Sequence, residues 1–141
     1  MNGEDLIFRV HGRIEARHDP ELQAIVTTYV RTYDPHGVFL PAGIRCGLEY
    51  AKAKGLKNWI VDVSREEDEM SEKDRAWEKS EEFRQIFRES SIRSIVFLLP
   101  AVDASGDTSW ADDFAEELGA DFACHVTASI NETKSILGKP T

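Results

Sequence analysis

The side chains best suited to chemistry follow a short apolar stretch, residues 58–63. Asp62 and Ser64 are succeeded by the acidic run 66–69 and then by Ser71. Carboxylates in such a run could ligate a divalent cation, and a serine that opens a helix could carry a phosphate. Metal cages need a defined number and spacing of ligands, however, and charge runs usually face water. We therefore predict no metal site and regard Asp62, Ser64 and Ser71 as candidate contacts for a partner.

Acid–base and nucleophilic chemistry has few candidates in this chain. None of the four histidines stands in a recognisable nucleophile motif, and no two share a helix face at metal-binding spacing. They are His11, His18, His36 and His125. The two cysteines, Cys46 and Cys124, match no metal or redox spacing and are expected to be buried free thiols. We predict no catalytic residue and no cofactor; an enzyme would need His11 or His125 within hydrogen-bond reach of a carboxylate in a pocket.

Length and charge narrow the classes of function. The chain has 141 residues, which is typical of a single domain over 1–141, and its net charge is −9 at pH 7. Such an acidic chain is unsuited to phosphate backbones and anionic membranes, so we expect neither nucleic acid nor a membrane as partner. No apolar run reaches membrane-spanning length, and no basic-then-apolar signal segment begins the chain. Both observations predict a cytoplasmic location.

The elements that must position these residues begin with two alternating stretches. Apolar and polar side chains alternate over residues 6–17 and again over 22–30, which predicts two strands, each with one buried face. A three-residue turn at 19–21 would join them as an antiparallel hairpin. In this register Ile14 faces Val26 and the apolar sides coincide, whereas a shift by one residue would mix the two faces.

The same register gathers cations on the outer face of the predicted hairpin. Arg9 would lie opposite Arg31, with Arg13 and Arg17 on the same face. On an acidic protein this basic face could receive the acidic surface of a second copy, or a partner's carboxylates or phosphates. It could equally be an exposed sheet face that arginine keeps soluble. We treat Arg9, Arg13 and Arg31 as candidate partner-binding residues and leave a homodimer open.

Further along the chain, helical and β patterns alternate. Helices are predicted over residues 40–54, 72–90, 109–118 and 129–137, and apolar strands over 58–63, 92–99 and 122–126. Ser71, Ser109 and Ser129 stand where helix N-caps are expected. Repeated strand–helix–strand units imply right-handed crossovers and parallel strands. The predicted fold class is therefore α/β: a single-layer mixed sheet with an N-terminal antiparallel hairpin followed by βαβαβα units.

The three tryptophans fall at positions that face a core or start a helix. Aromatic residues at helical spacing are usually part of the core, and we expect this of Trp59 and Trp110. Trp77 is the candidate exception, because its neighbour Ala76 could make the core contact and leave the indole at an interface.

The order of elements, with the stretch 55–62 before an acid-rich loop and a helix that carries Trp77, resembles the STAS-like family. These domains are relatives of the anti-sigma-factor antagonists and of the C-terminal domain of sulphate transporters. The resemblance extends over about 6–137. It implies a non-enzymatic regulatory module that binds partner proteins, and some relatives bind nucleotides or lipids.

The resemblance also implies a candidate phosphorylation site. The antagonists are switched at a serine just before the helix that follows this strand, within an Asp-Ser-Ser/Thr-Gly-like stretch. Ser71 occupies the comparable position here, in Glu-Met-Ser-Glu-Lys at 69–73, without the following serine and glycine. A phosphate is favoured at a helix N-terminus, but the surrounding acids would repel it. A plain N-cap is the competing interpretation of Ser71.

Two functions therefore stay open after the sequence has been read. The first is a regulatory, protein-binding module whose contacts lie near the carboxyl edge of the central strand, over 62–71 and the helix after it. The second is a small-molecule or lipid carrier with a pocket between helices and sheet. Carboxyl edges of parallel strands are where ligands gather in open α/β sheets, which suits both.

Overall fold

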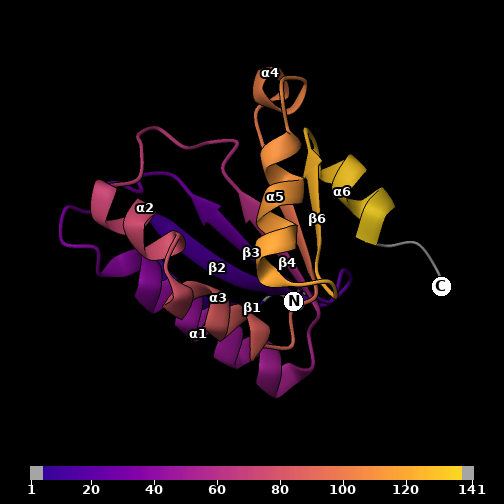
Figure 1. Ribbon diagram of the computed structural model, residues 1–141, viewed down its shortest axis with the longest axis horizontal. Coiled ribbons are helices and arrows are strands. Elements are labelled where there is room, and N and C mark those ends of the chain that lie inside the picture. Colours follow the sequence, from indigo (N-terminus) through magenta and orange to yellow (C-terminus); the bar gives the residue numbers. More distant parts are fainter. Residues whose placement is uncertain (1–4, 138–141) are drawn as a thin grey trace.

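The computed structural model describes residues 5–137, which form one mixed β-sheet with helices packed against it (Figure 1). The six strands of this part of the chain are β1 (Asp5–Val10), β2 (Ile14–Asp19), β3 (Ala24–Tyr29), β4 (Asn58–Asp62), β5 (Ser94–Leu98) and β6 (Ala123–Thr127). They lie side by side in chain order. The pairs β1–β2 and β2–β3 are antiparallel, and β3 to β6 are parallel. The predicted α/β class and the antiparallel N-terminal start are thus confirmed.

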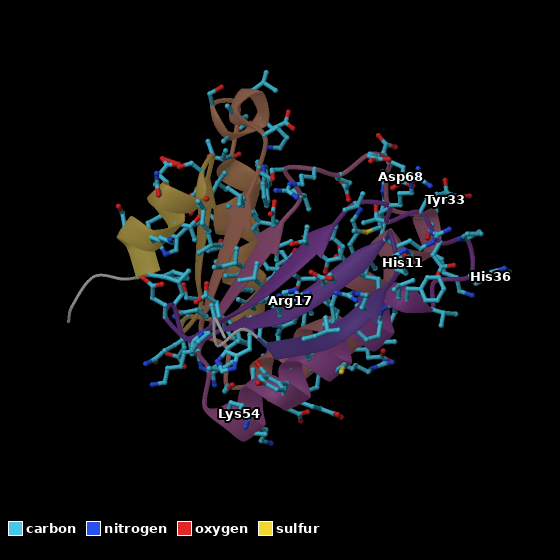
Figure 2. The ribbon with its side chains drawn as sticks, turned by 180° about the vertical axis from the view of Figure 1, so that it is seen from behind. His11, Arg17, Tyr33, His36, Lys54 and Asp68 are labelled. Atoms are coloured by element: carbon cyan, nitrogen blue, oxygen red, sulfur yellow. The ribbon has the colours of Figure 1, made fainter. Side chains whose placement is uncertain are left out.

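Helices lie on both faces of the sheet but cover them unequally. Over residues 5–137 they are α1 (Phe39–Lys54), α2 (Glu72–Glu78), α3 (Glu81–Arg88), α4 (Ala101–Ala104), α5 (Ser109–Leu118) and α6 (Ile130–Leu137). The helices α1, α2, α3 and α5 share one face, as expected when successive parallel strands are joined by crossovers of one hand. On the opposite face α6 packs on β5 and β6. Seen from that side, β1 to β3 have no helix over them (Figure 2).

The main core lies between the sheet and the helices α1, α2, α3 and α5. Trp59 is 6% exposed and stacks on Phe87 with ring centroids 4.9 Å apart, as expected of a core tryptophan. Its indole N–H donates to Thr27 Oγ1 at 2.8 Å, which satisfies the buried polar atom. A Cβ added to Gly43 of α1 would lie 2.9 Å from the ring of Phe8. Glycine at this position therefore lets α1 approach β1 closely.

The first predicted strand, residues 6–17, is in fact two strands. A tight turn at 11–13 separates them, in which the N–H of Arg13 donates to the carbonyl oxygen of Val10 at 2.9 Å. Gly12 has a φ of +73°, in the left-handed region that glycine adopts without strain. The chain therefore reverses at a glycine inside an otherwise continuous alternation, and the sheet begins with three antiparallel strands.

The predicted register of the hairpin is also wrong. Ile14 lies opposite Tyr29 instead of Val26, and the connecting loop is the four residues 20–23 instead of 19–21. The strand β3 contributes to the core under α1 on one face and to a smaller apolar cluster under α6 on the other. Because both faces of this strand are apolar, alternation alone could not select the register.

The corrected pairing changes the neighbours of the arginines. Arg9 lies opposite Glu15 rather than Arg31, and its Nη2 is 2.7 Å from Glu15 Oε1. Arg17 Nε approaches the other oxygen of Glu15 at 2.7 Å. Like charges directly opposite each other destabilise a sheet, whereas placing the Glu15 carboxylate between the two arginines does not. The open face around Arg17 (Figure 2) is therefore a network of mixed charge rather than the uniformly basic face that was predicted.

Two of the predicted helices need correction. The helix expected over 72–90 is divided at Ser80, whose Oγ accepts a hydrogen bond from the N–H of Phe83 at 3.3 Å and caps α3. Ser80 itself is extended, with φ −80° and ψ 158°, so α2 cannot continue through it. Ser109 is the first residue of α5 and not its N-cap; Thr108 holds the cap position without a side-chain hydrogen bond.

Candidate functional site

A pocket of about 230 Å³ lies between the sheet and the helices α1, α2, α3 and α5. It reaches the carboxyl ends of β3, β4 and β5, the edge where open α/β sheets usually bind ligands. Six aromatic side chains contribute to its walls: Tyr29, Trp59, Phe83, Phe97, Trp110 and Phe114. Its polar lining, besides the Tyr29 hydroxyl, comes from Thr32, Glu66 and Glu78.

The aromatic wall is held in place by ring-to-ring contacts. Phe97 of β5 meets Trp110 and Phe114 of α5 edge-on, with ring centroids 5.0 and 5.6 Å apart. Phe83 of α3 meets Phe114 in the same way at 6.0 Å. Trp110 is 40% exposed, so it stands at the rim instead of in the core as expected. It lies in the first turn of α5, and this position leaves part of its indole in water.

Glu78, the last residue of α2, is the most perturbed carboxyl group of the pocket. Burial raises its pKa to about 7, and the neighbouring carboxylates Asp74 and Glu66 contribute to the rise. Among residues 5–137 no hydrogen bond or salt bridge reaches its side chain. A mostly buried carboxylate without a counter-ion is costly, because the ionised form loses its hydration without gaining a partner. The Glu78 carboxylate can therefore take up a proton or form an ion pair with a positively charged group of a bound molecule.

A second acid lies one helical turn before Glu78. Asp74 is 1% exposed, and neither of its carboxylate oxygens has a hydrogen-bond partner in the described part of the chain. Burial raises the pKa of Asp74, and the nearby Asp34 carboxylate adds to the rise. Asp34 differs because it accepts backbone hydrogen bonds from His36, Val38 and Phe39 at 2.8 to 3.1 Å. Burial opposes ionisation of Asp34, but these three donors leave its pKa below the usual value.

The acidic run 66–69 is partly structural and not simply a solvated loop. Thr32 Oγ1 donates to Glu66 Oε2 at 2.9 Å, and the Thr32 N–H donates to Asp68 Oδ1 at 2.6 Å. Asp68 also accepts from the N–H of Tyr33, and Figure 2 shows these two residues side by side at one end of the sheet. Burial raises the pKa of Glu66, with the carboxylates of Asp68 and Glu69 adding to the effect. The loop thereby places Glu66 at the mouth of the pocket.

A search of residues 5–137 finds no group of three His, Cys, Asp or Glu side chains placed to hold a metal ion. The acidic residues that line the pocket are Glu66, from the loop 66–69, and Glu78, from α2. What this arrangement offers chemically is an apolar space with a protonatable, unpaired carboxylate at its side.

The residues predicted at the carboxyl edge of β4 do not form a common surface. Asp62 Oδ1 accepts from the N–H and the hydroxyl of Ser64 at 3.0 and 2.6 Å, which is a local turn. Ser71 is 4% exposed, and its Oγ accepts from the N–H of Asp74 at 3.2 Å. The geometry matches the N-cap interpretation and leaves this hydroxyl little access to solvent. Trp77 donates its indole N–H to Glu82, and the guanidinium of Arg45 lies 5.7 Å from the ring centre.

The three predicted arginines also lie apart from the pocket. Arg9 and Arg13 line a separate groove on the open face of the sheet, together with His11. Arg13 Nη1 donates to the carbonyl oxygen of Tyr33 at 2.9 Å, and Arg9 is paired with Glu15 as described. Arg31 lies outside that groove and pairs with Glu67 at 3.3 Å.

The remaining ionisable candidates are the histidines and the cysteines. Neither His11 nor His125 makes a hydrogen bond or ion pair with a carboxylate within residues 5–137, which was the condition set for an enzyme. Both cysteines are free and partly buried. Burial raises the pKa of Cys124 to about 12, with a smaller contribution from Asp112.

The functional residues missed by sequence reasoning are Asp74 and Glu78. The sequence suggested Ala76 for the core contact of this helix, yet Ala76 is exposed and the inner face of α2 carries the two acids. A signal was present, because Asp74 and Glu78 are four residues apart and so share one helix face. The spacing shows that they share a face, but not that this face packs inward.

Two further findings complete the description. No helix within residues 5–137 combines the length and the apolar character needed to cross a bilayer. Comparison of the chain with protein-family models, with curated proteins and with solved structures finds no match.

Proposed function

We propose that this protein is a small-molecule-binding module of the STAS-like type and that its ligand occupies the pocket next to α2, α3 and α5. The observation that carries the proposal is an open apolar space with an unpaired carboxylate on its wall. Protein cores are normally close-packed, and an empty apolar space lowers stability. Ligand pockets share this composition, with mostly apolar walls and a few polar groups that orient the ligand.

The size of the pocket limits the ligand. Pockets for drug-sized molecules have volumes of roughly 300–1,000 Å³. A space of about 230 Å³ suits a smaller molecule, or one end of a longer molecule whose remainder passes the rim at Trp110. A short alkyl chain with a polar end group meets this requirement.

The first test is the native mass of the gently purified protein, which should exceed that of the bare chain or of an integral oligomer. The second test uses 1-hexanol, followed by chemical-shift changes in NMR spectra. Val63→Phe places a larger side chain in the pocket and should abolish shifts at Trp110 and Phe114. Val102→Phe is the matched control, because Val102 is 78% exposed and lies outside the pocket, and it should leave hexanol binding unchanged. Equal hexanol binding by both variants would remove the pocket from the proposal.

A regulatory, protein-binding function near the same edge is the second proposal. It is supported by two exposed apolar residues, Val102 of α4 and Trp110 of α5. The helix α4 projects beyond the end of the sheet (Figure 1). Paired replacement by Val102→Asp and Trp110→Ala should abolish capture of a partner from the native host. Val38→Asp, at another exposed valine, is the control and should leave capture intact. Capture that survives the paired replacement contradicts a partner site on α4 and α5.

A further inference from the structure

The lining of the pocket also indicates the chemical class of the ligand. We propose that the ligand carries an organic ammonium group, which pairs with Glu78 beside the aromatic wall, and an apolar body that fills the remaining space. This inference rests on the proposed function, because it concerns the same pocket.

The charges around the pocket all have one sign. Glu66 and Glu78 line it, Asp74 lies behind Glu78, and no lysine, arginine or histidine of the described chain is among the lining residues. Of the cations near these acids in the sequence, Arg65 lines the groove on the open face of the sheet instead, and Arg75 of α2 pairs with Glu69 at 3.3 Å. A ligand that brings its own negative charge would meet repulsion without any compensating cation. A ligand that brings a positive charge would meet three attractions.

Glu78 supplies a specific partner for such a cation. Its carboxylate lines the mostly apolar pocket and receives no hydrogen bond from residues 5–137, so an incoming ammonium would provide the missing counter-ion. Hydrogen bonds in which both groups are charged are about twice as strong as neutral ones. The pair would also relieve the desolvation of the ionised carboxylate, which a neutral ligand leaves in place.

The aromatic wall favours the same class. Faces of tryptophan, tyrosine and phenylalanine rings attract cations, and cages of such rings are a common way to bind organic ammonium ions. Trp110 at the rim, with Phe97 and Phe114 behind it, forms an aromatic wall in contact with the pocket. An ammonium ligand can form an ion pair with Glu78 and is also attracted by the aromatic rings, whereas an alcohol can only form a hydrogen bond with Glu78.

The test compares three molecules with the same apolar body: hexylamine, 1-hexanol and hexanoate. Binding is followed by NMR titration at pH 8, where Glu78 is ionised and an alkylamine, like a lysine side chain with a pKa of about 10.4, is still charged. We expect hexylamine to bind at least ten-fold more tightly than hexanol and hexanoate to bind most weakly. Glu78→Gln should lower the affinity for hexylamine to that of hexanol and leave hexanol within two-fold of its original value.

A matched variant separates local pairing from net charge. Glu116→Gln removes one negative charge from an exposed position of α5 and should leave the ten-fold preference for hexylamine intact. Hexanol binding without a preference for the amine, or an amine preference that survives Glu78→Gln, would refute the ammonium inference while leaving the pocket as a binding site. If none of the three molecules shifts the pocket resonances, the proposed function fails as well.

Discussion

The unpaired carboxyl of Glu78 makes a quantitative prediction about stability. Its pKa is raised from 4.5 to about 7 by burial and by the neighbouring acids. The folded protein therefore holds this proton more tightly than the unfolded chain does. The stability gained from the neutral carboxyl is complete below the unfolded value of 4.5 and is lost as the pH rises through 7. Each unit of pKa difference corresponds to about 1.4 kcal/mol, so the total loss is about 3 kcal/mol.

Glu78→Gln removes the ionisation and should remove this loss. The amide and the neutral carboxyl have similar shape and polarity, so at pH 5, where little of the loss has set in, the variant should exceed the wild type by no more than about 1 kcal/mol. At pH 8 it should be more stable than the wild type by about 3 kcal/mol. Denaturant unfolding followed by circular dichroism, extrapolated to water at both pH values in 0.15 M salt, measures this difference.

The comparison between the two pH values is what tests the reasoning. Any intrinsic cost of burying the amide is the same at pH 5 and pH 8 and cancels in the difference. Glu116→Gln, which removes a carboxyl that lies in water, is the control and should show no such gain at pH 8. If the difference between Glu78→Gln and wild type is the same at both pH values to within ~0.5 kcal/mol, the carboxyl is not buried and unpaired as described.

Three further predictions concern contacts that hold the fold. Thr127 and Thr133 share a buried hydrogen bond at 2.7 Å that joins α6 to the sheet. Thr127→Val should lower the free energy of unfolding in urea by about 1–3 kcal/mol, because the Thr133 hydroxyl loses a partner. A double valine variant that loses more stability than the two single variants added together would contradict this. Ser71→Ala should cost about 1 kcal/mol through loss of the α2 cap, whereas Ser71→Asp, which can still accept the hydrogen bond, should restore most of it in the same assay. Asp34→Ala should destabilise the protein more at pH 7 than at pH 3. The pKa of Asp34 is lowered in the folded protein, so the stability that its carboxylate contributes is present above the unfolded pKa and is lost as the pH falls. An equal loss of stability at both pH values in thermal unfolding would refute this prediction.

The sequence by itself determined the elements that are specified locally. Gly55, with a φ of +70°, caps the C-terminus of α1, and Ser129 directly precedes α6 and accepts at its Oγ from the N–H of Glu132 at 3.1 Å. Both signals are contained within a few residues, so they can be read without knowing what packs against them. The buried strands β4 and β5 and the mixed α/β class follow in the same way from continuous apolar runs between helical patterns.

The tertiary structure alone decided the pairing of the strands and the composition of the pocket. The register of β2 on β3 depends on which face each strand buries, and β3 is apolar on both. The orientation of α2 depends on the break at Ser80, which turns Asp74 and Glu78 inward rather than Ala76. Sequence patterns assume that acids face water, because burying an unpaired carboxylate is unfavourable. Where the packing of the other helices makes up for that cost, the pattern predicts the wrong inner face, and here the face that actually packs inward carries the candidate site.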